Sequence, residues 1–318
     1  MKKVILFLGI FLLGFVVAGA QTPSATPAPT PFRETRVATP IDRGGLNRAV
    51  PVNPFEMRQM ILQASVQPLY RKPTKKELQA VAPDAGLLKK YDDFLRRDDT
   101  GLFKFVADYG CAENTKIVTA TENCLKFSMP GAGNSYSFRT NNYRLRRLAD
   151  LTYNGKYFYV AGVLTHGILV SVGDVPLENI TLQTAGTKFL NEFQPAADFE
   201  KAAEIDQQLI KGVQKDGFFY SRALSVLENT TYVLRSIAYN GKSFRAVRGV
   251  TYNEFDFDKR KDVTIAFRVV RLDSDGSVTI LWKELLRKDA PKIMRKSKTI
   301  DKRVRENKLV AKNTAAGR

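Results

Sequence analysis

The stretch VTIAFRVVRL at residues 263–272, followed by DSDG at 273–276 and VTILWKEL at 278–285, decides the fold of this chain. Alternation of apolar residues along the first run is typical of a β-strand with one buried face. The Asp, Ser and Gly residues between the two runs favour a turn. The stretch therefore predicts an antiparallel hairpin, and four residues of its first strand are expected to face the core: Val263, Ile265, Phe267 and Val269.

Two Asn-Gly pairs predict two more hairpins. Asn154-Gly155 separates residues 143–153 from residues 156–164. Asn240-Gly241 separates residues 231–239 from residues 242–251. Asn-Gly between runs of alternating apolar residues is a strong hairpin signal, because both residues accept the positive φ of a tight turn. The C-terminal half is therefore predicted to be an antiparallel meander.

Helical patterns precede and interrupt these strands. Residues 55–63 and 84–97 are predicted to be helical, and Thr74 with Glu77 forms a capping box that begins another helix. Residues 195–215 predict one helix between the two Asn-Gly pairs. We therefore expect a strand-rich α+β fold with N-terminal helices and one inserted helix, whose antiparallel sheet is open, a sandwich or a partial barrel.

The first 20 residues have the features of a secretory signal peptide. Lys2 and Lys3 precede an apolar run at residues 4–17, and Ala18-Gly19-Ala20 supplies small residues for a cleavage site. The run is shorter than the roughly 20 apolar residues of a membrane-spanning helix, although an uncleaved anchor is the alternative. We expect cleavage after Ala20 and a secreted or periplasmic protein.

Composition divides the remaining chain into three parts. Residues 21–54 hold seven of the fourteen prolines and predict a disordered linker. Residues 55–286 predict a globular domain, with 195–217 as an alternative internal boundary. Residues 287–318 form a basic tail with twelve Lys or Arg and three Asp or Glu, a net charge of +9.

Export favours a disulfide between Cys111 and Cys124, because these are the only two cysteines and an oxidising compartment favours their pairing. His166 is the single histidine, so no Cys/His or multi-His zinc site is expected. The residues Thr165-His166-Gly167 favour a turn over a catalytic triad. The segment Pro130-Gly131-Ala132-Gly133-Asn134 lacks the Lys-Ser/Thr of a phosphate-binding loop and is predicted to be a turn, so no nucleotide cofactor is expected.

The net charge of +18 favours anionic partners. The tail lacks aromatic residues, which disfavours base stacking on nucleic acid. The first hypothesis is a non-enzymatic envelope or surface protein whose tail contacts anionic polysaccharide or lipid. Seven cations of the tail are the candidate anion-binding residues: Lys292, Arg295, Lys296, Lys298, Lys302, Arg303 and Arg305.

A second hypothesis is an extracellular glycan hydrolase. Glu254, Asp256 and Asp258 alternate with aromatic residues, so an extended chain would project all three acids from one face. Glycoside hydrolysis uses paired carboxylates. Three cations follow immediately at residues 259–261, which favours the simpler interpretation of a solvated charged face.

Overall fold

The computed structural model describes residues 53–107 and 129–294. The chain divides into two units, Met1–Pro51 and Val52–Arg318, and all described residues belong to the second. The predicted signal peptide, nearly all of the predicted linker and both cysteines lie outside the described residues, as does the tail from Arg295 onward.

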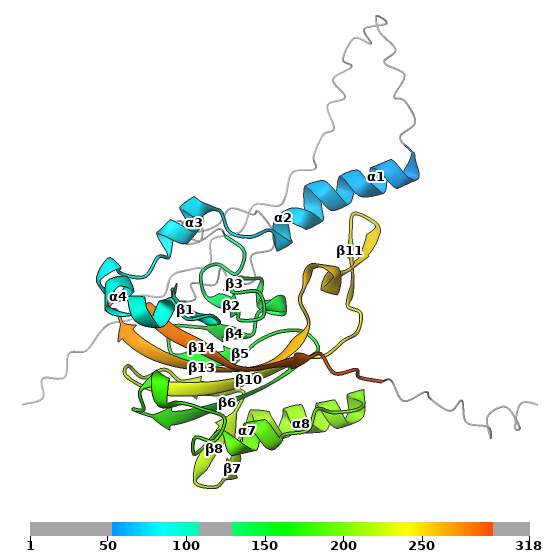
Figure 1. The fold of residues 1–318 in the computed structure, drawn as a ribbon. Coiled ribbons are helices and arrows are strands. Elements are labelled where there is room, and N and C mark those ends of the chain that lie inside the picture. The colour runs from blue at the N-terminus through cyan, green and yellow to red at the C-terminus, as the bar shows by residue number, and fades with distance from the viewer. Residues whose placement is uncertain (1–52, 108–128, 295–318) are drawn as a thin grey trace, which may run out of the picture. The chain divides into compact units, whose positions relative to one another are not determined.

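The larger of two main sheets has seven strands, and every neighbouring pair is antiparallel (Figure 1). The hairpin predicted at residues 263–285 is confirmed, since Leu272 lies opposite Val278 in the ladder. The strands in spatial order are β1 (Thr100–Phe105), β14 (Val278–Asp289), β13 (Lys261–Leu272), β10 (Thr231–Ala238), β6 (Thr165–Gly173), β8 (Phe218–Ser221) and β7 (Val213–Lys215).

The smaller main sheet contains the first Asn-Gly hairpin. The Asn154 side-chain oxygen accepts hydrogen bonds from the backbone N–H groups of Lys156 and Tyr157 at 3.1 and 2.8 Å, which closes the turn. The hairpin prediction at Asn154-Gly155 is therefore confirmed. In spatial order the strands are β3 (Asn142–Tyr143), β2 (Ser135–Ser137), β4 (Leu151–Tyr153), β5 (Tyr157–Val160) and β9 (Ala223–Ser225).

The hairpin predicted at Asn240-Gly241 is wrong. Strand β10 pairs with β6 and β13, whereas β11 (Phe244–Val247) pairs with β12 (Val250–Asn253). The tight turn lies at Arg248-Gly249, where both residues have positive φ, +47° and +78°. The physical reason is burial. All eight residues of β10 are buried, and pairing with two long strands buries more of its surface than a two-stranded hairpin with β11 would.

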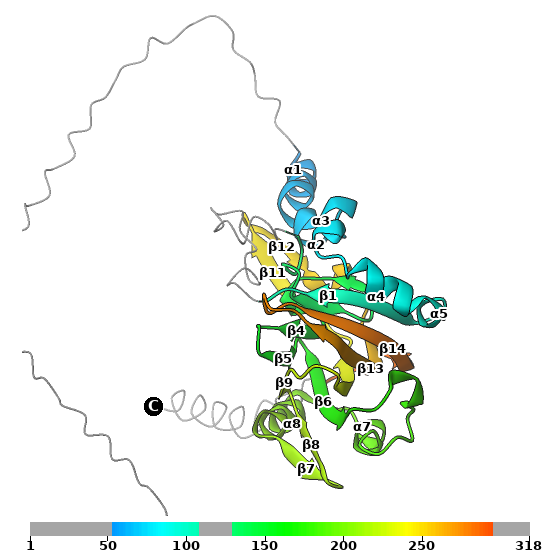
Figure 2. The ribbon, with the colours of Figure 1, turned by 90° about the vertical axis from the view of Figure 1, so that its left-hand side faces the viewer.

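The two main sheets enclose an aromatic core. Figure 2 shows β4 and β5 beside the large sheet. The four residues predicted to face the core from residues 263–269 do so, packed with Phe158 of the smaller sheet and with Phe138, which directly follows strand β2. Trp282, the single tryptophan of the chain, lies in this core with its ring 5.3 Å from that of Phe138. Its indole also covers Gly101, where a Cβ would come within 2.5 Å of Nε1.

Helices cover the opposite face of the large sheet. Below it in Figure 1 lie α7 (Lys188–Glu192) and α8 (Phe199–Lys211), while α5 (Asp92–Leu95) adds Phe94 to the same apolar cluster. Helix α8 is the predicted inserted helix: Asp198 accepts a hydrogen bond from the Lys201 N–H at its start, and Gly212 with φ +88° ends it. A short 3₁₀ turn, η3 (Leu177–Asn179), precedes α7.

The N-terminal helices pack beside β12. The segment comprises α1 (Pro54–Ile61), a π-helical turn η1 (Leu62–Val66) and α2 (Gln67–Tyr70). Val66 and Tyr70 are buried in one apolar cluster with Tyr252 and Phe255. The 3₁₀ turns η2 (Arg146–Leu148) and η4 (Glu254–Phe257) also contribute residues to this cluster. The capping box at Thr74 is confirmed and begins α3 (Lys75–Ala80), which α4 (Ala85–Lys90) follows. None of the described helices is long and apolar enough to cross a membrane.

Candidate functional site

The three candidate carboxylates do not share a face. The extended conformation expected for residues 254–258 is wrong, because Glu254–Phe257 forms η4. Asn253 starts this turn by accepting a hydrogen bond from the Phe255 N–H, and the turn lets Phe257 stack on Tyr70 with ring centroids 4.5 Å apart. As a result Asp256 is exposed, while the side chains of Glu254 and Asp258 are fully buried.

Glu254 is a buried ion-pair partner. Arg147 donates from Nε and Nη2 to Oε2 at 3.1 and 3.0 Å, and Arg245 lies 3.5 Å from Oε1. The Tyr70 hydroxyl donates to Oε1 at 3.1 Å. Burial raises the pKa of Tyr70, and its contacts with Tyr252 and Glu254 raise it further, so the hydroxyl stays protonated. The carboxylate therefore holds η4 against η2 and β11.

Asp258 belongs to a second buried network. Its Oδ2 accepts hydrogen bonds from Arg139 at 2.8 Å and Arg260 at 3.1 Å, and Arg139 donates in turn to Asp150 at 2.8 Å. Burial lowers the pKa of Arg260 to about 10, which leaves the guanidinium charged at neutral pH. In this arrangement only Asp256 of the three acids has surface that a substrate could meet.

His166 is the second residue of strand β6 and does not lie in the expected turn. Its Nδ1 is 3.1 Å from the Tyr239 hydroxyl, which already accepts from the Ala196 N–H, and its Nε2 is 3.0 Å from the Ala202 carbonyl. These contacts fit a neutral imidazole that donates from Nε2. Burial lowers the pKa of His166, and the nearby Asp206 only partly offsets this because its carboxylate pairs with Arg222 at 2.7 Å. His166 therefore links α8 to the sheet.

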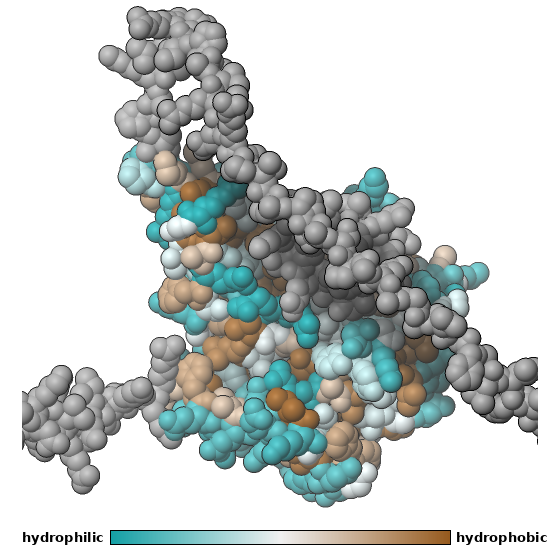
Figure 3. All heavy atoms as spheres, turned by 180° about the vertical axis from the view of Figure 1, so that it is seen from behind, coloured by the Kyte–Doolittle hydropathy of each residue, from teal (hydrophilic) through white to brown (hydrophobic). Residues whose placement is uncertain are grey.

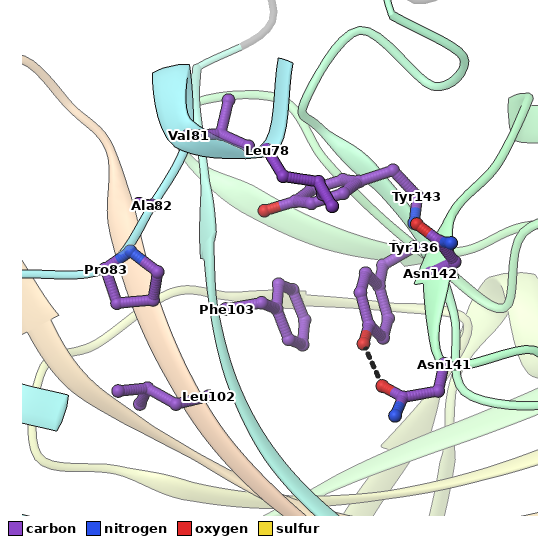
Figure 4. Close-up of a pocket in the computed structure, with 10 residues that line it drawn as sticks. All are labelled: Leu78, Val81, Ala82, Pro83, Leu102, Phe103, Tyr136, Asn141, Asn142 and Tyr143. Atoms are coloured by element: carbon purple, nitrogen blue, oxygen red, sulfur yellow. Dashed lines mark hydrogen bonds between the residues drawn. The ribbon is translucent and has the colours of Figure 1, made fainter. Parts of the chain in front are cut away.

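A cavity of about 250 Å³ opens beside β1, β2 and β3 (Figure 4). Phe103 and Tyr136 stack in parallel with centroids 3.8 Å apart, and the Tyr143 ring meets the edge of both. Burial raises the pKa of both tyrosines, so their hydroxyls stay uncharged. Ten residues line the cavity: Leu78, Val81, Ala82, Pro83, Leu102, Phe103, Tyr136, Asn141, Asn142 and Tyr143.

The polar groups of the cavity gather on one side. Asn141 and Asn142 lie opposite Pro83 and Leu102 in Figure 4. The Tyr136 hydroxyl donates to Asn141 Oδ1 at 2.5 Å, and the Tyr143 N–H donates to Asn142 Oδ1 at 2.9 Å. Neither side-chain amino group has a partner among the described residues.

A cationic and apolar surface lies over α1 and the β11–β12 ribbon. We call it the ribbon surface. Its four large apolar side chains are more than half exposed: Phe55 (65%), Met57 (51%), Met60 (61%) and Phe244 (65%). Three exposed cations lie on or next to these elements: Arg58 in α1, Lys242 before β11, and Arg248 in the turn between β11 and β12. Figure 3 shows hydrophobic and hydrophilic residues side by side over α1.

Helix α1 is held beside the ribbon by its own cation. Arg58 donates to the Thr251 carbonyl of β12 at 3.2 Å, and α1 and β11 lie side by side in Figures 1 and 2. No residue of α1 is buried. The sequence signal for this surface was present in PFEMRQMI, whose apolar residues surround the helix and cannot all be buried on one side.

Of the seven predicted anion-binding residues, only Lys292 is described, and it is exposed. Its neighbours attach the end of the described chain: Ile293 packs near Tyr239, and the Met294 N–H donates to the Ala197 carbonyl at 2.9 Å. Within residues 53–107 and 129–294, no group of three or more His, Cys, Asp or Glu side chains could hold a metal ion.

The fold and these sites define a strand-rich α+β protein with two facing antiparallel sheets, a helix layer on the larger sheet, and an exposed cationic and apolar surface. Comparisons with protein families, with curated proteins and with solved structures give no match.

Proposed function

We propose that the protein is a non-enzymatic envelope protein that binds an anionic lipid surface through the ribbon surface. One observation carries this proposal: four large apolar side chains of α1 and β11 are each more than half exposed, and three exposed cations lie on α1 or next to either end of β11. Apolar side chains that enter the headgroup region and cations that meet anionic lipid contribute to the same binding event.

The apolar residues favour lipid over polysaccharide. A polyanionic polysaccharide would attract Arg58, Lys242 and Arg248, but it would leave Phe244 and the two methionines in water. A lipid headgroup region accepts both kinds of side chain. The basic tail, with its net charge of +9, would add Coulomb attraction to the same surface. Export by the predicted signal peptide would bring the protein to an envelope membrane.

The experiment measures cosedimentation of residues 21–318 with phosphatidylcholine vesicles that contain about one third phosphatidylglycerol. Binding is expected to these vesicles, to be much weaker on pure phosphatidylcholine, and to fall as salt rises from about 0.05 to about 0.5 M. Replacing Met57, Met60 and Phe244 by Ala together should weaken binding at least about tenfold, because each side chain loses apolar burial.

Leu227→Ala is the matched control, since Leu227 is 59% exposed but lies outside the ribbon surface. It should bind like the unaltered chain. A variant that ends at Met294 separates the contribution of the tail. Equal binding of the triple variant and the control would refute the role of the ribbon surface, and retention by alginate without binding to vesicles would instead identify an anionic polysaccharide as the partner.

A further inference from the structure

The cavity beside β1, β2 and β3 is preformed. Its floor is the parallel stack of Phe103 and Tyr136, whose planes differ by 2°. Tyr143 is held in place because its hydroxyl donates to the Lys104 carbonyl at 2.6 Å. Val81 is buried in the main core, so the wall formed by residues 78–83 is attached to the same body. A ligand would therefore meet a site that needs little rearrangement.

The size of the cavity restricts its ligand. A volume of about 250 Å³ is smaller than the pockets that hold drug-sized molecules, which begin at about 300 Å³. The greater part of the lining is apolar, from Leu78, Pro83 and Leu102 on one side to the aromatic floor on the other. The site thus suits a small molecule with a compact apolar body, such as one ring.

The polar side of the cavity offers donors. Asn141 Oδ1 accepts from Tyr136, and Asn142 Oδ1 accepts from the Tyr143 N–H, so both amide oxygens are already in use. Each amide also carries an NH₂ group with two N–H donors. These have no partner within the described chain, and because Asn141 is exposed and Asn142 is half-buried, they face solvent and are open to a ligand. A ligand oxygen that accepts hydrogen bonds would complete them.

Charge and donor count exclude other ligand classes. None of the ten described lining residues is Asp, Glu, Lys or Arg, so neither a cation nor an anion would find a counter-charge among them. A sugar carries many hydroxyl donors, which the occupied amide oxygens and the apolar walls would leave unpaired. We infer that the cavity binds a small, uncharged, mainly apolar molecule that carries a carbonyl-type oxygen, held by the side-chain amino groups of Asn141 and Asn142.

Two isosteric probes test this directly. Acetophenone has a ring and a carbonyl oxygen, and α-methylstyrene has the same shape with a methylene group in place of that oxygen. In NMR titrations of the full chain, acetophenone is expected to bind roughly 3- to 10-fold more tightly, as one hydrogen bond that replaces a hydrogen bond to water predicts. The side-chain amide signals of Asn141 and Asn142 should shift with acetophenone and much less with α-methylstyrene.

Asn141→Asp isolates the donors. Aspartate keeps the oxygen that accepts from Tyr136 and tolerates the positive φ of +48° at this position. It lacks the N–H donors of residue 141, so the preference for acetophenone over α-methylstyrene should decrease, and only the contribution of the Asn142 amino group should remain. Unchanged binding of α-methylstyrene would show at the same time that the cavity remains folded.

Ala82→Phe blocks the cavity from its exposed rim, and Ala246→Phe places the same side chain on the distant β11. Both probes should lose affinity for the first variant and keep it for the second. The inference is overturned if neither probe binds, if the two probes bind equally to the unaltered chain, if Ala82→Phe binds as well as Ala246→Phe, or if methyl glucoside binds more tightly than acetophenone.

Discussion

Buried arginines restrict which packing of the strands this protein can adopt. Arg235 and Asp262 form a bidentate pair with bonds of 3.0 and 2.7 Å, and Arg139 bridges Asp150 and Asp258. Such pairs offset a large desolvation cost, so they stabilise a fold weakly when intact and destabilise it strongly when one partner is removed. A packing of the strands that separated these charges from their partners would be strongly destabilised, so the ion pairs restrict how the strands can pack.

Asp258→Asn and Asp256→Asn provide a matched test of the sequence-predicted carboxylates. The first change removes the charge that Arg139 and Arg260 share, so it should lower the free energy of unfolding by about 3 to 5 kcal/mol. The second acts on an exposed residue and should change it by no more than about 0.5 kcal/mol. Urea unfolding monitors both. Equal effects would contradict the buried network.

The pH dependence of stability should depend on His166. Its pKa is lowered in the folded state, whereas the unfolded imidazole titrates near 6.5. As pH falls below 6.5 the unfolded state therefore takes up more protons, and stability decreases until the folded pKa is reached. Because His166 is the only histidine, His166→Gln removes this dependence entirely.

The measurement is the free energy of unfolding between about pH 7 and pH 5. The slope should be positive in the unaltered chain and flatter in His166→Gln, whatever the absolute stability of the variant. Parallel curves would show that His166 keeps an ordinary pKa in the folded protein.

The conformation and position of the residues at the candidate sites were only partly predictable from the sequence. The sequence identified Glu254 and Asp258 as unusual, but their alternation with Phe255 and Phe257 predicted an exposed strand face. Tertiary packing against Tyr70 selected a 3₁₀ turn. The cavity could not be predicted, because its residues come from three segments that only the folded chain brings together.

At the scale of elements, one glycine sets the distance between the two main sheets. A Cβ on Gly167 of β6 would lie 1.7 Å from Val160 Cγ1 of β5, a separation that atoms cannot adopt. No side chain fits at this crossing, so β6 approaches β5 as closely as the two backbones and Val160 allow.

A double-mutant cycle tests this contact. Gly167→Ala should lower the free energy of unfolding by about 1 to 3 kcal/mol through overpacking. Val160→Ala makes room, so the double variant should be less destabilised than the sum of the two single variants by at least about 0.5 kcal/mol.

Gly86→Ala in α4 serves as the control in the same cycle, because its Cβ would meet only the side chain of Asp84, the residue before α4. Its effect should add to that of Val160→Ala. Additivity in both cycles would place β5 and β6 further apart than the structure has them.

Elements with strong local signals were predicted well. The hairpin of β13 and β14 and the turn at Asn154-Gly155 depend on residues adjacent in sequence. A local pattern is therefore sufficient to predict them. The pairing of β10 with β6 joins residues such as Leu234 and Leu169, which are far apart in the chain. No local pattern encodes that register. Asn240-Gly241 therefore predicted a hairpin between β10 and the next strand, whereas that strand, β11, pairs with β12.

At the scale of the whole molecule, stability should increase toward the centre of the large sheet. Strand β10 is buried on both faces and paired on both edges, whereas α1 buries none of its residues. Hydrogen exchange measured by mass spectrometry should be slowest in β10 and β13 and fastest in α1 and β7. Protection of α1 equal to that of β10 would mean that α1 packs in solution in a way this structure lacks.

The α+β class followed from composition and pattern, but the sequence did not decide between an open sheet, a sandwich and a partial barrel. The alternation in residues 263–269 showed that one face of β13 is buried without showing what covers it. The covering layer is the smaller sheet, and Phe138 and Phe158 pack in the same core cluster as the buried face of β13. Its short strands, such as β3 with two residues, carry too little sequence to be recognised.

The position of Trp282 gives the protein an intrinsic optical reporter. As the single tryptophan, buried between the sheets with no hydrogen-bond partner for Nε1 among the described residues, it emits from one apolar environment. Its emission should lie toward the blue while the sheets stay together and move to the red as water reaches the indole. Separation of the two layers can therefore be followed in the unlabelled chain.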